Sequence, residues 1–100
     1  MGAPTKYKKE HCKIAEDTLA NGKSLAAVCA KLNITRPTLY EWREHNPDFK
    51  EAIEKGLQKG QVHWEEIGEN GAHGLYKNFS AAAWIFTMKN RFREDYASGS

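Results

Sequence analysis

Apolar residues recur at helical spacing along most of the chain, which predicts an all-α fold. The pattern is clearest in residues 24–46, which we interpret as two short helices joined by a tight turn. Ser24 can cap the first helix through its hydroxyl, and Asn33 tolerates the left-handed conformation that a sharp helix exit requires. The apolar face of this first helix comprises Leu25, Val28, Cys29 and Leu32.

A second helix is predicted after the turn. Thr35 is placed to cap it, and Leu39 and Trp42 recur three residues apart, so both point back toward the first helix. Ile34 fills the corner between the two. Caps, corner and small residues at the crossing together favour a helix-turn-helix, in which one helix braces another that can enter the DNA major groove. The alternative is a helical hairpin whose outer face is only solvated.

The outward face of this second helix carries the candidate DNA contacts. Arg36 is the best candidate for reading bases, because a guanidinium can bond O6 and N7 of guanine together. Thr38 and Tyr40 can reach phosphates or base edges, whereas Arg43 and Lys31 suit backbone phosphates. The full predicted DNA-binding set is Lys8, Lys9, Lys31, Arg36, Pro37, Thr38, Tyr40, Glu41 and Arg43.

Three members of that set have ordinary alternatives. Glu41 could accept a hydrogen bond from cytosine, but an intrahelical salt link or plain solvation is the commoner role. Lys8 and Lys9 open a further helix predicted over about residues 8–20, and solvated surface lysines are at least as common there as phosphate contacts. Asn21-Gly22 ends this helix, since glycine is preferred in the left-handed position after a helix. Its inner side is predicted to carry His11, Ile14, Ala15, Thr18 and Leu19.

Asn46-Pro47-Asp48 marks the predicted domain boundary, with a three-helix module in residues 1–46 and a helical hairpin in residues 47–96. Proline suits the first helical position and aspartate complements the helix dipole, so a long helix is predicted from here to about Glu69. Gly56 and Gly60, four apart on its apolar stripe, either permit close approach of a neighbour or mark a kink. Glycines in residues 67–78 predict a loop, and residues 97–100 a disordered tail.

A short closing helix is predicted after Ser80, with Phe79 stapled onto Trp84 in the first turn. It is apolar on two faces, because Phe86 falls away from the stripe that carries Trp84 and Met88. One face can pack against the long helix. The other face can pack against a second subunit or, equally, against the loop or the front module of the same chain. The predicted oligomer interface comprises Phe49, Ile53, Leu57, Trp64, Ile67, Trp84, Phe86 and Met88.

Charge and cysteine content refine these expectations. The chain holds 15 basic and 13 acidic residues, and residues 1–46 hold eight against five, so the front half is the better candidate for phosphate contact. Cys12 and Cys29 lie on apolar helix faces, which predicts buried free thiols in a reducing compartment. No spacing typical of a metal site, catalytic pair or membrane span occurs, so we expect an intracellular, non-catalytic protein without a cofactor.

Four segments together resemble the small terminase subunits of tailed bacteriophages. They are KYKKEHCK, GKSLAAVCAKLNITRPTLYEWREHNPDFKEAIEKG, WEEIG and FSAAAWIFTMKNRF, which lie within residues 6–93. The resemblance implies recognition of double-stranded viral DNA by the front module and assembly of the hairpin into a ring. It also implies a separate large subunit, with ATPase and nuclease activity, as partner in the cytoplasm of an infected bacterium.

Two other classes of protein remain open. Transposases and resolvases have similar helix-turn-helix sequences, so the main alternative is a dimeric transcriptional regulator or recombinase accessory protein. Such a protein is expected to bind a palindromic site, because half-site spacing mirrors twofold symmetry. A helical adaptor that binds only proteins would show no salt-dependent DNA affinity.

Overall fold

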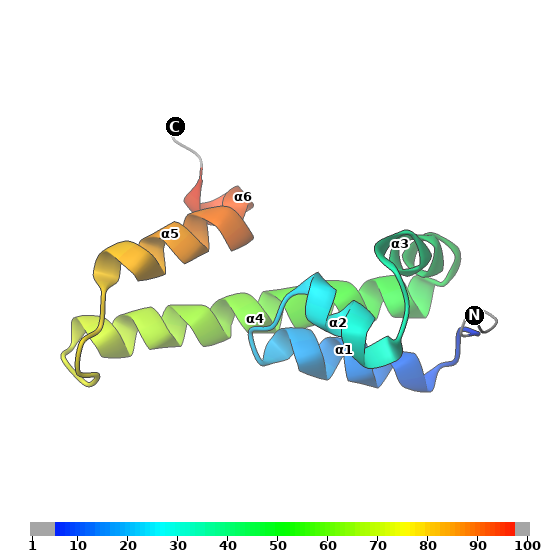
Figure 1. Cartoon of the computed structure of the whole chain (residues 1–100), viewed down its shortest axis with the longest axis horizontal. Helices are drawn as coiled ribbons and strands as arrows, with labels where there is room; N and C mark the ends of the chain where they lie inside the picture. Colours follow the sequence, from blue (N-terminus) through cyan, green and yellow to red (C-terminus); the bar gives the residue numbers. More distant parts are fainter. Residues whose placement is uncertain (1–5, 98–100) are drawn as a thin grey trace. The chain divides into compact units, whose positions relative to one another are not determined.

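The structure is a computed structural model that describes residues 6–97. This part of the chain contains six α-helices and no strands, which confirms the predicted all-α fold (Figure 1). The predicted disordered tail lies outside the described residues except for Ala97. The helices are α1 (Glu10–Ala20), α2 (Leu25–Leu32), α3 (Arg36–His45), α4 (Pro47–Ala72), α5 (Ala81–Arg91) and α6 (Arg93–Tyr96).

Two compact units make up the chain, and they divide between Gly60 and Gln61, inside α4. The predicted boundary after residue 46 therefore moves to residue 60. The reason is that the first turns of α4 complete the core of the front unit, where Phe49 and Ile53 are fully buried. That core comprises Ala15, Leu19, Val28, Cys29, Leu32, Leu39, Trp42, Phe49 and Ile53.

The predicted helix ends are confirmed where short-range chemistry decides them. The Ser24 hydroxyl accepts a hydrogen bond of 3.2 Å from the amide of Ala27, and α2 ends at Asn33 in the left-handed conformation, with φ of 56°. The Thr35 hydroxyl caps α3 in the same way as Ser24 caps α2. Gly22, with φ of 85°, follows α1 as predicted.

Four aromatic rings tie the start of α1, the end of α3 and the start of α4 together. His11 stacks on Trp42 with ring centroids 5.0 Å apart. Tyr7 meets Trp42 at 5.3 Å and Phe49 at 5.7 Å, both edge to face, which is a favoured geometry for aromatic pairs. Ile14, by contrast, is 37% exposed, so its predicted place on the inner side of α1 is wrong. The buried stripe of α1 runs through positions 11, 15, 18 and 19, and residue 14 lies at its edge.

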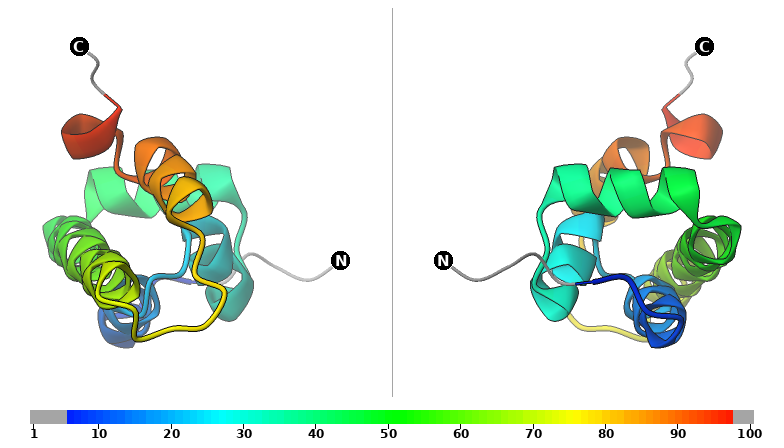
Figure 2. Two further views of the ribbon diagram at one scale, coloured as in Figure 1. Left: turned by 90° about the vertical axis from the view of Figure 1, so that its left-hand side faces the viewer. Right: turned by 90° about the vertical axis from the view of Figure 1, so that its right-hand side faces the viewer.

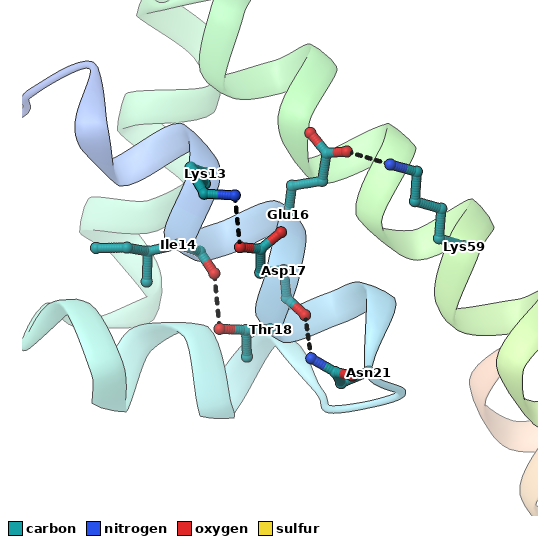
Figure 3. Close-up of polar contacts among 7 residues, drawn as sticks. All are labelled: Lys13, Ile14, Glu16, Asp17, Thr18, Asn21 and Lys59. Atoms are coloured by element: carbon teal, nitrogen blue, oxygen red, sulfur yellow. Dashed lines mark hydrogen bonds and ion pairs between the residues drawn. The ribbon is translucent and has the colours of Figure 1, made fainter.

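Gly56 and Gly60 allow α1 and α4 to pack closely. A Cβ atom added at Gly56 would lie 2.8 Å from Cβ of Leu19 and 3.0 Å from the carbonyl oxygen of Glu16, and one at Gly60 would overlap the carbonyl oxygen of Leu19. Beside this contact, Lys59 Nζ bonds a carboxylate oxygen of Glu16 at 2.6 Å (Figure 3). Close packing, rather than a kink, therefore accounts for the two glycines.

Gly68 and Gly71 serve the second unit in the same way. The ring of Trp84 lies on Gly68 and the ring of Phe79 on Gly71, each so close that a Cβ atom would overlap it. Trp84 Nε1 also donates a hydrogen bond of 2.8 Å to the carbonyl oxygen of Trp64. α4 therefore continues past its predicted end at about Glu69, and the predicted loop is wrong as far as Ala72, because aromatic rings cover these glycines.

A terminal turn, α6, folds back onto α4 within the second unit. The Tyr96 hydroxyl donates to Glu65 at 2.8 Å, and Gln61 donates to Asp95 at 2.6 Å. The guanidinium of Arg91 lies 5.5 Å from the centroid of a Trp64 ring. A segment of four residues is too short to show a helical period, so α6 was not predicted from the sequence.

Burial changes the predicted oligomer interface. Phe49, Ile53 and Met88 are fully buried within a single chain, so their side chains offer no surface to a second subunit. This part of the prediction is corrected: the heptad-like spacing that suggested an interface at Phe49 and Ile53 instead builds the front core. Leu57 and Phe86 do expose apolar surface, at 39% and 69%. Trp64, Ile67 and Trp84 are half-buried.

Candidate nucleic-acid interface

α3 lies across α1 and the first part of α4, and it is seen lengthwise where those two helices are seen nearly along their axes (Figure 2). Its inner face is fixed by Leu39, which is fully buried, and by Trp42. The predicted DNA contacts of α3 lie outside this inner face. Arg36, Pro37, Tyr40 and Glu41 are exposed, whereas Thr38 and Arg43 are half-buried.

Arg36, Tyr40 and Arg43 form one stripe on this outer face, because they are spaced at i, i+4 and i+7. Arg36 Nη1 donates a hydrogen bond of 2.7 Å to the hydroxyl of Tyr40. The guanidinium of Arg43 lies over the Tyr40 ring at 5.1 Å from its centroid, and that of Arg36 at 6.0 Å. The structure thus places two cations along an aromatic side chain on an exposed helix face.

Thr38 is part of the cap at the start of α3. Its amide donates to the Thr35 hydroxyl at 3.4 Å, and that hydroxyl donates in turn to Thr38 Oγ1 at 3.1 Å. Because Thr38 Oγ1 already accepts a hydrogen bond, its own proton is left to donate. A hydroxyl donor at the start of a surface helix suits a phosphate oxygen.

The three predicted lysines lie on other elements. Lys31 is exposed in the last turn of α2, and Lys8 and Lys9 are exposed just before α1. Lys9 lines a groove of about 270 Å³ between α1 and α4, to which Asp48 and Glu51 also contribute and α3 does not. These carboxylates offset its charge, so Lys9 is the least favourable of the three for phosphate.

Acidic side chains also approach the stripe of Arg36, Tyr40 and Arg43. Arg43 borders a groove of about 310 Å³ between α3 and α4, whose lining includes Glu44, Lys50 and Glu54. Glu41 makes no ion pair with any residue in the described range 6–97, so the intrahelical salt link considered for it is not formed. The outer face is thus mixed in charge, with its cations concentrated at Arg36 and Arg43.

A polar cluster that the sequence analysis did not identify lies at the start of α4. The Tyr7 hydroxyl is 3.1 Å from Cys12 Sγ and lowers the pKa of the Asp48 carboxyl by a hydrogen bond. Burial, together with these neighbours, raises the pKa of Tyr7 well above its ordinary value. Burial likewise raises the pKa of the Cys12 thiol, against the opposing bond from Tyr7. No local spacing joins residue 48 to residues 7 and 12, so only the fold brings them together.

Both cysteines are free thiols, as predicted, although Cys12 is only half-buried. Within residues 6–97, no group of three or more His, Cys, Asp or Glu side chains is placed to hold a metal ion. Among the described helices, none has the length and apolar character needed to cross a membrane.

No protein-family model matches this chain, and no curated protein or solved structure matches it either. Its function must therefore be inferred from its own residues and their geometry.

Proposed function

We propose that the chain binds double-stranded DNA through a helix-turn-helix formed by α2 and α3. The observation that carries the proposal is the two-sided character of α3. Leu39 and Trp42 anchor one side in the core, and Arg36, Tyr40 and Arg43 form a cationic stripe on the other. An anchored helix with donors on its outer face can enter the major groove without unfolding its support.

In this proposal Arg36 reads base edges and Arg43, Lys31 and the Thr38 hydroxyl bind phosphates. The net charge of +3 in residues 1–46 is small for a DNA-binding module. Assembly into an oligomer compensates for this, because linked copies bind one duplex at a high effective concentration. DNA binding and assembly are therefore parts of one mechanism.

The more specific proposal is a non-catalytic small subunit of a phage DNA-packaging terminase. It is supported by the resemblance of segments in both units, from KYKKEHCK to FSAAAWIFTMKNRF. The assembled subunits would present viral DNA to a large ATPase and nuclease subunit in the cytoplasm of the infected host. The exposed apolar side chains of Leu57 and Phe86 are the candidates for contacts between copies.

Substitution of Arg36 tests the DNA-binding surface. Duplexes of about 20 base pairs are first selected from a randomised pool, and affinity is measured by fluorescence anisotropy at several salt concentrations. We expect Arg36→Gln to weaken binding to the selected duplex by about 5- to 150-fold, the range for a lost base contact, with unchanged circular dichroism. Lys13→Gln is the matched control, because it removes an equal charge from an 83% exposed side chain on α1.

Equal affinity of Arg36→Gln and the parent would remove Arg36 from the site. A parent without salt-dependent DNA affinity would overturn DNA binding and favour the protein-binding adaptor. Selection of a palindromic duplex by a clean dimer would favour the regulator or recombinase accessory protein over the terminase subunit.

A further inference from the structure

We infer that Tyr40 is a positioning residue that holds the Arg36 guanidinium ready to read a base, and so contributes to sequence specificity by acting through Arg36. The inference rests on the proposed DNA binding and deepens it. It starts from a contact made in the DNA-free chain, the hydrogen bond of 2.7 Å from Arg36 Nη1 to the Tyr40 hydroxyl.

This bond orients Arg36 without using up its recognition chemistry. A guanidinium is a planar fork with N–H groups on several edges, and only one N–H is donated to Tyr40. The remaining groups can still form the paired bonds to O6 and N7 of guanine. The hydrogen bond to Tyr40 is therefore compatible with base reading.

The ring of Tyr40 is itself held from the other side. Arg43 lies three residues further along α3, with its guanidinium 5.1 Å from the ring centroid, a separation typical of cation–π contacts. Tyr40 is 41% exposed, whereas its neighbour Leu39 is fully buried. The two arginines and the spacing along α3 thus define where the hydroxyl of Tyr40 lies.

Pre-orientation matters because exposed arginines are flexible. An arginine that is free in solution loses much of its rotamer freedom when it binds a base, and that loss weakens binding. A side chain that is already ordered loses less. Deleting the Tyr40 hydroxyl should therefore weaken binding to the selected duplex by about two- to tenfold, while a scrambled duplex of equal length is bound as before.

Tyr40→Phe is the test variant, because it removes the hydroxyl and retains the ring over which Arg43 lies. Its effect is measured in the parent and again in the Arg36→Gln background, as a double-mutant cycle. We expect the loss of affinity in the parent and no further loss when Arg36 is absent. Tyr76→Phe is the control, since it deletes another exposed tyrosine hydroxyl, which lies outside α3.

The side chain can also be observed without DNA. In the free protein, NMR should show faster exchange of the Arg36 guanidinium protons with water in Tyr40→Phe than in the parent or in Tyr76→Phe. A role of Tyr40 in folding alone would not change these protons while the helical signal is constant.

Three results would overturn the inference. Unchanged affinity of Tyr40→Phe for the selected duplex would show that the hydroxyl does not matter. An equal loss in the Arg36→Gln background would show that Tyr40 contacts DNA directly. A parent without DNA affinity would remove both the inference and the proposed function. The first of these results, combined with a loss of affinity in Arg36→Gln, would remove only the inference and leave the proposed function standing.

Discussion

At the scale of single residues, the Tyr96 phenol makes the free energy of unfolding depend on pH. Burial of the phenol and its bond to Glu65 raise the pKa of Tyr96 to about 12, because ionisation would place a second negative charge beside that carboxylate. The neutral phenol is thus favoured in the folded chain, where α6 folds back onto α4.

This shift predicts a loss of stability at alkaline pH. The folded pKa lies above the ordinary value of 10, so the contribution of Tyr96 is fully present below pH 10 and is lost as pH rises toward 12. We expect the urea midpoint to fall over this interval. The fall should be smaller in Tyr96→Phe, since that variant has no phenol to ionise there.

The pKa of the half-buried Tyr7 phenol is raised in the same direction, so a part of the alkaline loss should persist in the Tyr96→Phe variant. Ultraviolet absorbance titrations of the parent and of Tyr96→Phe distinguish the two effects, because the difference between the two curves is the tyrosinate of Tyr96. Ionisation of Tyr96 near pH 10, rather than near 12, would contradict the prediction.

At the scale of secondary-structure elements, the contact between α1 and α4 depends on two glycines, which have no side chain to hold the helices apart. Gly60 meets the backbone of Leu19, and Gly56 meets Leu19 and Glu16. The neighbour at Gly60 is a carbonyl oxygen, which cannot move aside without shifting α1. A flexible side-chain tip would yield more readily.

Gly60→Ala should therefore destabilise the chain although alanine favours helices. The propensity gain is about 1 kcal/mol, and overpacking in a rigid contact commonly costs more. With an overpacking cost of about 1–3 kcal/mol, we expect a net decrease of up to about 2 kcal/mol in the free energy of unfolding, measured by urea denaturation. Gln58→Ala, on an exposed position of the same helix, should change it by less than about 0.5 kcal/mol. An increase in stability for Gly60→Ala would show that α1 and α4 are not held this closely.

The same elements show where prediction from sequence succeeds. The caps at Ser24, Thr35 and Ser80 and the left-handed Asn33 were all predicted, and each depends on residues at most four apart. The predicted end of α4 was wrong, because closely spaced glycines are locally typical of a loop. Only the rings of Trp84 and Phe79, from a distant part of the chain, make a helix favourable there.

The candidate site was predictable to a similar extent. The outward position of Arg36 and Tyr40 follows from the helical period of α3, which the buried Leu39 and Trp42 define. The hydrogen bond between them depends on rotamers that spacing does not specify. The acidic surroundings of Lys9 depend on α4 lying beside α1, so they could not be read from residues near Lys9.

At the scale of the whole molecule, the exposed apolar side chains bear on assembly. Phe86 is 69% exposed on α5. An isolated exposed phenylalanine is unremarkable, but the proposed terminase subunit requires contacts between copies.

We expect light scattering to show a discrete assembly well above a dimer. Phe86→Asp should lower its mass with unchanged helical signal, because a charge would be buried at the contact. Leu75→Asp is the matched control, since Leu75 is 68% exposed but lies outside the predicted interface. A parent that is strictly monomeric at all concentrations would contradict the assembly, and equal mass for Phe86→Asp would exclude Phe86 from the contact.

The sequence by itself determined the helical class, the caps and the polar outer face of α3, because these follow from residues within a turn or two of one another. The tertiary structure alone decided that Phe49 and Ile53 complete the front core, that the units divide at Gly60, and that glycines mark close helix contacts. It also decided the grouping of Tyr7, Cys12 and Asp48. The physical reason is that burial and packing depend on which distant segment lies opposite, and local periodicity does not contain that information.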